Sequence, residues 1–307
     1  MNPRFNIETI NDPRLNPYRD LKQSSRTRWK RFVIAEGWRV TERLLQSSLT
    51  IESVLISEDK LEAHQSLVPK EVPLLVVDPK TCEELVGFNF HAGILAAAQR
   101  PKRTTFEKWA ENFLPDEPVV ALPQTNDPDN VGLIARTAAA LGVRKMILST
   151  SSSDPFSRRC LRLSIGAVLK LSLFESPRIG EHLQALRSNY GFTLFATVCD
   201  PDAPAIAELP VPDRSILVLG NETEGLSTDL QHLCQHRVTI PIQSEVDSLN
   251  VSSAAGIMLY EWNRQRHPPV PTGHLVPSKE KPLGNNRKQL LQRHLEAPIH
   301  LVRKNEN

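Results

Sequence analysis

The stretch Leu217-Val218-Leu219-Gly220-Asn221-Glu222-Thr223-Glu224-Gly225-Leu226 joins a short apolar run to a polar loop bounded by two glycines. Two other stretches have the same layout. Asp127 to Ala138 follows another apolar run, and Asp247 to Gly256 follows Ile240-Pro241-Ile242. In α/β proteins, chemistry is concentrated at such junctions between a strand and a helix. We therefore expect the three stretches to act together.

The composition is that of an ordinary globular chain. Its 307 residues suggest one or two domains, and 40% hydrophobic with 23% charged residues is enough to bury a large core. The formal net charge is +2. Because this charge is nearly balanced, composition gives no global nucleic-acid signature, and any basic patch must be local.

Apolar runs that predict strands alternate with patterns that predict helices along most of the chain. In the longer second part the predicted strands are 119–122, 145–148, 169–174, 192–198, 215–219 and 238–242, and the main helices are 131–141, 179–190 and 250–265. Strands this apolar along their whole length indicate a parallel sheet covered on both faces. A shorter alternating unit ends near Gln99.

These patterns divide the chain into five parts. We predict an N-terminal lead at 1–20, a small α/β domain at 21–99, a linker at 100–117, a second α/β domain at 118–267 and a tail at 268–307. Prolines and charged residues mark the linker. The tail is polar, basic and weakly patterned, so we expect it to be mostly disordered.

The sequence favours a cytoplasmic protein without a metal. The first residues lack the apolar core of a signal peptide, and no apolar run is long enough to span a membrane. The four cysteines are far apart, which is typical of free thiols in a reducing compartment. His232, Cys234 and His236 are close in sequence, but only the two histidines would share a helix face, so we predict no metal site.

Individually, the polar residues of the three stretches have ordinary explanations. Asn130 would by default cap the helix that follows it, and Ser248 would cap the final helix. Glu222 would cap a helix starting near Leu226 or face a site. Arg136 lies in a helix of Ala, Leu, Ile and Thr, where an arginine either extends to solvent or has an anionic partner.

In combination, the three stretches resemble the signature motifs of the SpoU (TrmH-type) RNA 2′-O-ribose methyltransferases of the SPOUT superfamily. The corresponding residues are Asn130-Val131-Gly132 with Arg136-Thr137-Ala138 for motif 1, Leu219-Gly220-Asn221-Glu222 with Gly225-Leu226 for motif 2, and Ile240-Pro241-Ile242 with Ser248-Leu249-Asn250-Val251-Ser252 for motif 3. Arg162-Leu163-Ser164-Ile165-Gly166-Ala167 is similar to a segment found between motifs 1 and 2.

The resemblance is strong over 119–266. Over 31–99 it is weaker, and there the chain is similar to the L30e-like substrate-binding domain that often precedes a SpoU domain. It implies a SPOUT-type α/β fold, in which a mostly parallel sheet with helices on both faces is knotted into a trefoil. It also implies a homodimer with its site near the subunit interface.

The resemblance further implies S-adenosyl-L-methionine as cofactor, held largely by backbone groups. The implied pocket comprises Leu219, Gly220, Gly225, Ile240, Ser248 and Leu249. In the family the motif 1 arginine, here Arg136, activates or orients the 2′-hydroxyl. A guanidinium stays protonated, so orienting the hydroxyl through the adjacent phosphate suits it better than acting as a base. The residues expected to hold the surrounding geometry are Asn130, Glu222, Ser248 and Asn250.

The basic residues would then contact RNA phosphates. The candidates are Lys22, Arg26, Arg28, Lys30, Arg31, Lys102, Arg103, Arg158, Arg159 and Arg162. Because L30e-like modules resemble proteins that recognise structured RNA loops, the sequence favours ribosomal RNA over transfer RNA as partner.

Other interpretations stay open at this point. The chain could be a non-catalytic RNA-binding or assembly factor that kept the fold, although five intact polar motif residues argue against it. A base-methylating SPOUT enzyme is a second alternative, which the motif 1 arginine disfavours. A dinucleotide-binding enzyme is a third, and no GxGxxG follows the first strand of either predicted domain.

Overall fold

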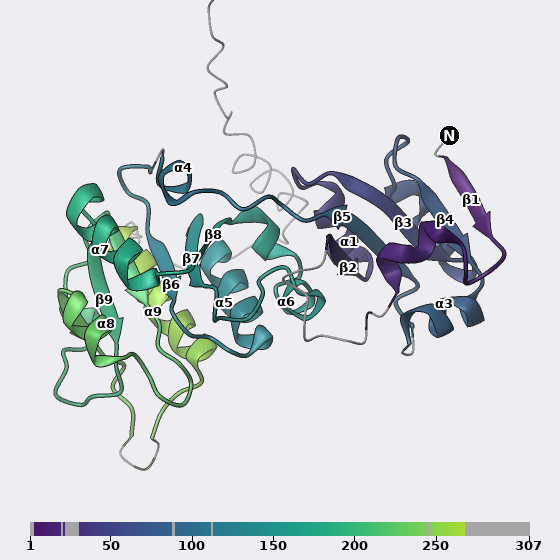
Figure 1. Cartoon of the computed structure of the whole chain (residues 1–307). Coiled ribbons are helices and arrows are strands. Elements are labelled where there is room, and N and C mark those ends of the chain that lie inside the picture. Colours follow the sequence, from purple (N-terminus) through teal and green to yellow (C-terminus); the bar gives the residue numbers. More distant parts are fainter. Residues whose placement is uncertain are drawn as a thin grey trace, which may run out of the picture. The chain divides into compact units, whose positions relative to one another are not determined.

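A computed structural model describes residues 3–19, 21, 31–87, 90–111, 113–243, 245 and 247–267. Two β-sheets organise this part of the chain, one of five strands and one of six, and both belong to one compact unit (Figure 1). The predicted disordered tail at 268–307 lies outside the described residues.

The N-terminal sheet is mixed. Its strands are β1 (Arg4–Ile7), β2 (Phe32–Glu36), β3 (Ile51–Ser57), β4 (Leu74–Val77) and β5 (Ile94–Gln99), in the order β1-β4-β3-β5-β2. β1, β4 and β3 run parallel, whereas β5 is antiparallel to both β3 and β2. The helices of this part are α1 (Trp38–Leu45), α2 (Leu61–His64) and α3 (Pro79–Val86). The L30e-like character of this part stays a prediction.

The first residues differ from the expected polar lead. β1 pairs with β4 as an edge strand, and a 3₁₀ helix at Pro13–Tyr18 follows it. Leu15 and Tyr18 are completely buried, and the Tyr18 hydroxyl donates a hydrogen bond of 2.8 Å to the Ser53 carbonyl. Leu15 and Tyr18 therefore attach this segment to the sheet, which its polar, proline-containing composition did not predict.

The second sheet is parallel throughout its described pairs. Its strands are β6 (Val119–Leu122), β7 (Lys145–Ser149), β8 (Ser172–Ser176), β9 (Thr193–Thr197), β10 (Ser215–Val218) and β11 (His236–Val238), in the order β11-β9-β10-β6-β7-β8. Each neighbouring pair runs in the same direction. The prediction of a mostly parallel sheet is confirmed, because strands that are apolar at every position are buried on both faces.

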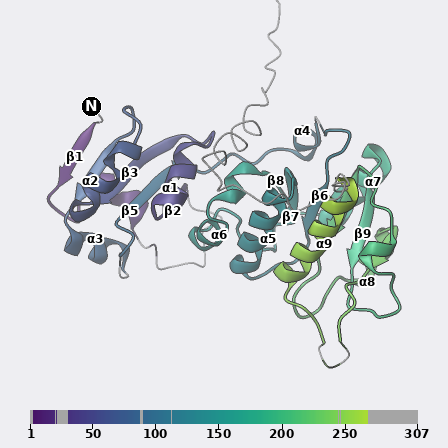
Figure 2. The same ribbon diagram turned by 180° about the vertical axis from the view of Figure 1, so that it is seen from behind.

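Helices cover both faces of this sheet, as the views from the front and from behind show (Figures 1 and 2). They are α4 (Phe106–Ala110), α5 (Pro128–Ala140), α6 (Arg158–Leu163), α7 (Ile179–Tyr190), α8 (Thr228–Leu233) and α9 (Val251–Arg266). Alternate strand residues contribute to different cores: Val120 and Leu122 join the cluster of α5, α6 and α9, and Val119 and Ala121 join that of α4 and α7.

The segment predicted as a linker packs against the second sheet. Phe106 and Trp109 of α4 are buried, and the Trp109 indole N–H donates to the Ser172 carbonyl at 3.0 Å. The buried Lys145 ammonium donates to the carbonyls of Trp109, at 2.8 Å, and Glu111, at 3.1 Å. Burial lowers the pKa of Lys145. These contacts attach the segment through its aromatic residues.

Two strand predictions were displaced. The expected strand at 169–174 begins later, as β8, because a 3₁₀ helix at Ala167–Lys170 follows Gly166, whose φ is +71°. The expected strand at 238–242 lies earlier, as β11, and its pairing with β9 ends at Val238. Pro241 has no backbone N–H with which to extend that ladder.

Helix α6 connects the two sheets. Arg158 at its start donates to the Glu36 carboxylate of β2 at 2.6 Å, and Arg43 of α1 donates to the Ile165 carbonyl just beyond its end. α6 also packs closely on α5. A Cβ added at Gly132 would lie 2.8 Å from the Cys160 carbonyl oxygen, so the backbones approach more closely than a side chain permits.

We predict that Gly132→Ala lowers the free energy of unfolding by about 1–3 kcal/mol, because the added methyl group forces α5 and α6 apart. Urea denaturation measures this change. Gly180→Ala is the matched control, since the nearest atom to a Cβ at this helical glycine is 4.0 Å away. An equal loss of stability in both variants would contradict the close-packing argument.

Candidate active site

Helix α5 brings motif 1 to the end of β6. Its N-cap is Asp127, whose carboxylate accepts from the Asp129 backbone N–H at 2.9 Å, and Pro128 occupies the first helical position. The expected N-cap role of Asn130 is therefore wrong. Asn130 lies one turn further on, with 5% of its surface exposed, and its side chain is left to bind elsewhere.

Motif 2 forms a tight turn after β10. The backbones of Asn221 and Gly225 exchange hydrogen bonds of 2.9 and 3.0 Å, and Gly225 has a φ of +68°. A Cβ at Gly220 would lie 2.7 Å from the Gly225 carbonyl carbon. Both glycines are thus required by the turn itself. Glu222 at the tip does not cap a helix, because α8 begins later and is capped by Ser227.

Sequence reasoning did not assign Asn221 a role. Its side-chain oxygen accepts from the Thr223 N–H at 2.8 Å and the Glu224 N–H at 3.1 Å, and its side-chain nitrogen donates to the Gln124 carbonyl at 2.9 Å. Asn221 therefore ties the motif 2 turn to the loop that leads into motif 1. Its position between Gly220 and Glu222 was the available signal.

Motif 3 leads into α9. The N-cap is Asn250, which accepts from the backbone N–H groups of Ser252 and Ser253 at 2.9 and 3.4 Å. The expected cap Ser248 is exposed and lies before the helix, so that expectation is also wrong. Small residues of α9 pack on α5, where a Cβ at Gly256 would be in ordinary contact with the Thr137 methyl group at 3.8 Å.

The three motifs meet at Asn130. Its side-chain nitrogen donates to the Glu222 carboxylate at 2.7 Å, and its side-chain oxygen accepts from the Asn250 side-chain nitrogen at 3.1 Å. Residues 92 and 120 positions apart are thereby linked in one chain of hydrogen bonds. Three of the five predicted catalytic residues lie together.

The loops beside this chain present unpaired backbone groups. Gly220 is buried, yet neither its N–H nor its C=O bonds to any described residue. The backbone groups of the half-buried Ile240 and Leu249 and of the exposed Ser248 also have no partner among the described residues. Buried backbone groups normally have partners. A ligand rich in donors and acceptors, such as an adenosine, fits this set. Of the predicted cofactor residues, Leu219 is instead bonded to the Ala121 carbonyl, and Gly225 to Asn221.

Arg136 lies apart from Asn130. Its side chain is exposed and makes no hydrogen bond or ion pair with the described residues. Six residues along a helix correspond to a rotation of about 240°, so the two side chains leave α5 on different sides. The sequence left two alternatives for the Arg136 side chain, extension to solvent or an anionic partner. Among the described residues it extends to solvent and has no anionic partner.

Some of the predicted RNA-binding residues form ion pairs within the chain, whereas others are exposed. Arg158 bonds to Glu36, and Arg159 forms a bidentate ion pair with Asp129 that includes a bond of 2.6 Å. The Arg159 guanidinium lowers the pKa of Asp129. Arg31 and Arg162 are exposed. The other predicted residues of the N-terminal basic run, Lys22, Arg26, Arg28 and Lys30, lie outside the described residues.

The histidines considered as metal ligands do not share a helix. His232 lies in α8, whereas His236 begins β11 and stacks on Phe195 with ring centroids 4.9 Å apart. Among the described residues, no group of three or more His, Cys, Asp or Glu side chains is arranged to hold a metal ion. The described helices are too short or too polar to cross a membrane.

Comparisons with known proteins match this arrangement. The model of the SpoU rRNA methylase family matches residues 117–260. An uncharacterised tRNA/rRNA methyltransferase of Mycobacterium bovis is 31% identical over 264 residues, covering 83% of this chain and 90% of that protein. The chain belongs to the SpoU rRNA methylase family. As a SpoU protein it is an RNA methyltransferase, which confirms the family predicted from the three motifs.

Two further proteins are similar to this SpoU chain. The 23S rRNA (guanosine-2′-O-)-methyltransferase RlmB of Acinetobacter baylyi is 32% identical over 187 residues, covering 60% of this chain and 75% of RlmB. The solved structure of an AdoMet-bound rRNA methyltransferase from Sinorhizobium meliloti matches with a TM-score of 0.70 at 23% identity, over 86% of this chain and 99% of that one. The second likeness is one of fold, and it confirms the predicted fold class. The knot stays a prediction.

We predict that Asn130→Ala lowers the free energy of unfolding by about 1–3 kcal/mol, because it leaves polar groups of Glu222 and Asn250 without their partner. Thermal or urea unfolding measures the loss. Asn189→Ala is the control, since the Asn189 side chain is exposed on α7 and makes no hydrogen bond with the described residues. We expect it to change stability by less than about 0.5 kcal/mol. Similar values for both variants would contradict the role of the hydrogen-bond chain.

Proposed function

We propose that this SpoU protein transfers a methyl group from S-adenosyl-L-methionine to a ribose 2′-hydroxyl of structured RNA, and that this RNA is ribosomal. The observation that carries the proposal is the hydrogen-bond chain Glu222–Asn130–Asn250, which unites the three motifs at the end of the parallel sheet. The name of RlmB specifies 2′-O-methylation of a guanosine in 23S rRNA. The resemblance to RlmB therefore supports the ribose 2′-hydroxyl as the methylated group and ribosomal RNA as the substrate.

The backbone groups of Gly220, Ile240 and Leu249, which have no partner in the part of the chain that the structure describes, support S-adenosyl-L-methionine as cofactor. Main-chain donors and acceptors can bind an adenine edge, and the absence of a side chain at Gly220 permits close approach. When bound, the cofactor supplies an electrophilic methyl group on a sulfonium. The protein's task is to align the 2′-oxygen with that methyl group and to let its proton leave.

Arg136 is the residue that we assign to the reacting hydroxyl. A guanidinium remains protonated, so it cannot take up the hydroxyl proton. It can bind the phosphate next to the ribose in a bidentate manner and thereby orient the 2′-oxygen, while the proton passes to phosphate or water. The exposed side chain, with no partner among the described residues, is available for this contact.

We further propose that the protein works as a homodimer. α9 packs on α5 and exposes two large apolar side chains, Ile257 at 45% and Tyr260 at 60%. Arg136 leaves α5 on a different side from Asn130, and a second subunit placed against these helices would receive it. The site of one subunit would then be completed by Arg136 of the other. We place this dimer in the cytoplasm, where its four free thiols stay reduced.

We predict that Arg136→Ala lowers methyl transfer at least about a hundredfold, because the 2′-oxygen is no longer oriented. The measurement is transfer from labelled S-adenosyl-L-methionine to unmodified ribosomal and transfer RNA, with the product mapped by resistance to alkaline cleavage. Arg144→Ala, at an exposed arginine of the same domain, is the control and should retain transfer.

A single alkali-resistant position in ribosomal RNA, lost in Arg136→Ala, is the expected result. Methylation that leaves the linkage sensitive to alkali would indicate base methylation instead. If the wild type binds RNA and transfers no methyl groups to any fraction, the non-catalytic interpretation replaces the proposal.

We predict that Tyr260→Glu converts the protein to a monomer and abolishes transfer, because it places a charge in the apolar interface. Sedimentation velocity measures the mass. Trp38→Glu is the control, since Trp38 is 44% exposed in the N-terminal part, and it should leave the dimer intact. Mixed dimers of Arg136→Ala and Asn130→Ala subunits should regain activity, because one of their two sites combines both wild-type residues. A monomeric wild type would refute the dimer.

A further inference from the structure

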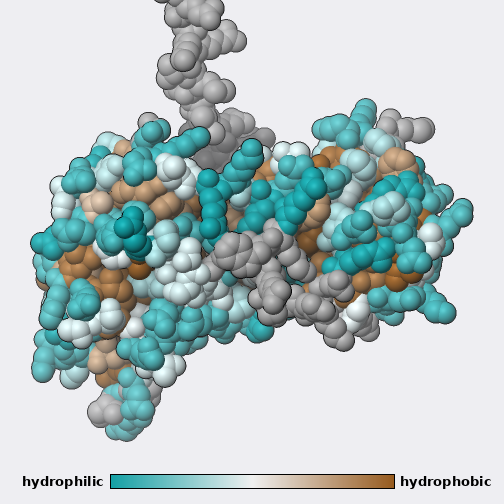
Figure 3. Space-filling model, viewed as in Figure 1, coloured by the Kyte–Doolittle hydropathy of each residue, from teal (hydrophilic) through white to brown (hydrophobic). Residues whose placement is uncertain are grey.

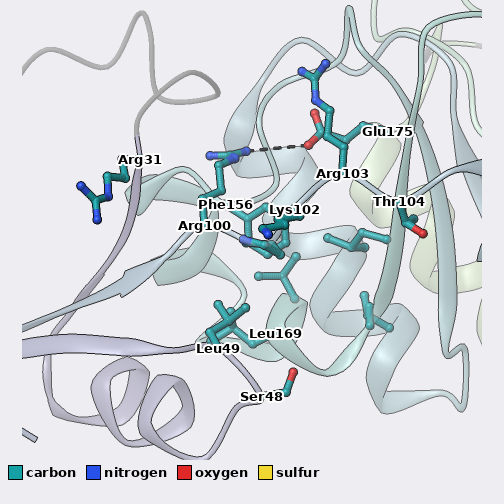
Figure 4. A pocket seen from close by; sticks show the side chains of 14 residues that line it. Arg31, Ser48, Leu49, Arg100, Lys102, Arg103, Thr104, Phe156, Leu169 and Glu175 are labelled. Carbon is teal, nitrogen blue, oxygen red and sulfur yellow. Dashed lines mark ion pairs between the residues drawn. The ribbon is translucent and has the colours of Figure 1, made fainter.

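A pocket of about 490 Å³ opens where the N-terminal part of the chain meets the second sheet (Figure 4). No residue of the three motifs lines it. Arg31 and Leu49 come from the N-terminal part, Lys102 and Arg103 from the segment after β5, and Leu169 from the 3₁₀ helix before β8. Nothing in the proposed methyl transfer uses this space.

The pocket combines an apolar floor with a basic rim. Leu49, Phe156 and Leu169 are partly exposed and present apolar surface, and Phe156 adds an aromatic ring. Four basic side chains line the pocket and one carboxylate, Glu175, opposes them. That carboxylate lies 3.8 Å from Arg100 (Figure 4), so it already has a cationic neighbour.

Arg100 acts as part of the wall. Its guanidinium donates to both carboxylate oxygens of Asp154, at 3.1 Å in one of the two bonds, and lies 5.2 Å from the centre of the Phe156 ring. The remaining basic groups belong to Arg31, Lys102 and Arg103. Lys102 is exposed and makes no hydrogen bond or ion pair with the described residues.

This combination suits a nucleotide. A nucleobase binds apolar and aromatic surface through its face, and a phosphate binds lysine and arginine. The volume lies within the range of small-molecule sites. The basic rim disfavours a purely apolar ligand. Inorganic phosphate would have no use for the apolar floor, so it also fits the pocket less well than a nucleotide. Hydrophilic side chains also gather on the surface over the segment that joins the two sheets (Figure 3).

The pocket shares a loop with motif 1. In the loop between β7 and α6, the Ser152 hydroxyl accepts from the Thr125 N–H at 3.1 Å, and the Ser153 N–H donates to the Thr125 carbonyl at 2.8 Å. Asp154 of the same loop holds Arg100, and Phe156 lines the pocket. One loop therefore supports both the pocket and the residues that lead into α5.

We propose that this pocket binds a single unpaired nucleotide of the substrate RNA, at a position other than the one that is methylated. The inference rests on the proposed function. A polymer is favoured over a free nucleotide because the chain next to Arg31 carries further basic residues, among them Arg28 and Lys30. Binding there would fix the distance along the RNA between the pocket nucleotide and the target ribose.

The test is binding of a short fluorescein-labelled single-stranded oligouridylate to the full chain, measured by fluorescence anisotropy over a range of salt concentrations. Lys102→Glu reverses one charge at the rim, and Ser48→Trp fills the pocket without changing its charge. Lys108→Glu is the matched control, because Lys108 is an exposed lysine of α4 that does not line the pocket. Thermal unfolding and the affinity for S-adenosyl-L-methionine establish that each variant is folded.

We expect Lys102→Glu to lower the slope of log Kd against log salt by about 0.7 relative to the control, as for one lost phosphate contact with a single strand. Ser48→Trp should weaken binding about tenfold, because the indole occupies the space of the base and the base can no longer stack inside the pocket, and should leave the slope unchanged. Equal effects of Lys102→Glu and Lys108→Glu, or no effect of Ser48→Trp, would overturn the nucleotide pocket.

The two proposals fail separately. If the wild type methylates a ribose and RNA binding does not depend on the pocket, the nucleotide site is rejected and the proposed function stands. If RNA binding depends on the pocket and no 2′-O-methylation occurs, the catalytic proposal is rejected and the binding site stands as a feature of an RNA-binding protein.

Discussion

The buried carboxamide of Asn130 is the constraint on which the site depends. A carboxamide offers a donor and an acceptor at the same end of a short side chain, and here both are used. The Glu222 carboxylate can only accept when ionised, so the nitrogen must face Glu222 and the oxygen must face Asn250. Aspartate would lack the donor, and leucine would lack both groups. Asn130 thus holds the loop after β10 and the start of α9 against α5. Neither aspartate nor leucine, which have a similar shape, could make both hydrogen bonds.

The sequence predicted the parallel sheet and the meeting of its polar loops, because both follow from local patterns. Strands apolar at every position have to be covered on both faces, and glycines flank the motif 2 turn where the backbone needs them. Capping could not be assigned in this way. Asp127 caps α5 because Pro128 occupies the first helical position, and Asn130 is thereby moved inside the helix. Likewise, the acidic partners of Arg158 and Arg159 lie far away in sequence and are found only in the folded chain.

Tertiary contacts also decide what the sequence described as a lead and a linker. Their composition is polar and rich in proline, which is typical of loops and linkers without tertiary contacts. A few large side chains override those rules, since Tyr18 and Trp109 each bury a ring and place a polar group on a backbone carbonyl. Helix α6 packs closely against Gly132 of motif 1 and also contacts β2 through the ion pair of Arg158 with Glu36. It thereby links the candidate site to the N-terminal sheet. Motif 1 is therefore supported from the N-terminal sheet as well as from its own.

The role that we propose for Arg136 depends on both the geometry and the charge of its guanidinium. A general base would have to approach the hydroxyl and exchange its proton, and a guanidinium does not release its proton at neutral pH. In the role that we propose, it offers a planar set of donors for two oxygens of one phosphate, which would fix the backbone of the RNA and with it the ribose. Such a contact is best formed by a side chain that enters the complex without an internal partner to displace. Exposure of Arg136 on a helix of small, apolar residues meets that requirement, and a carboxylate beside it would have removed the advantage.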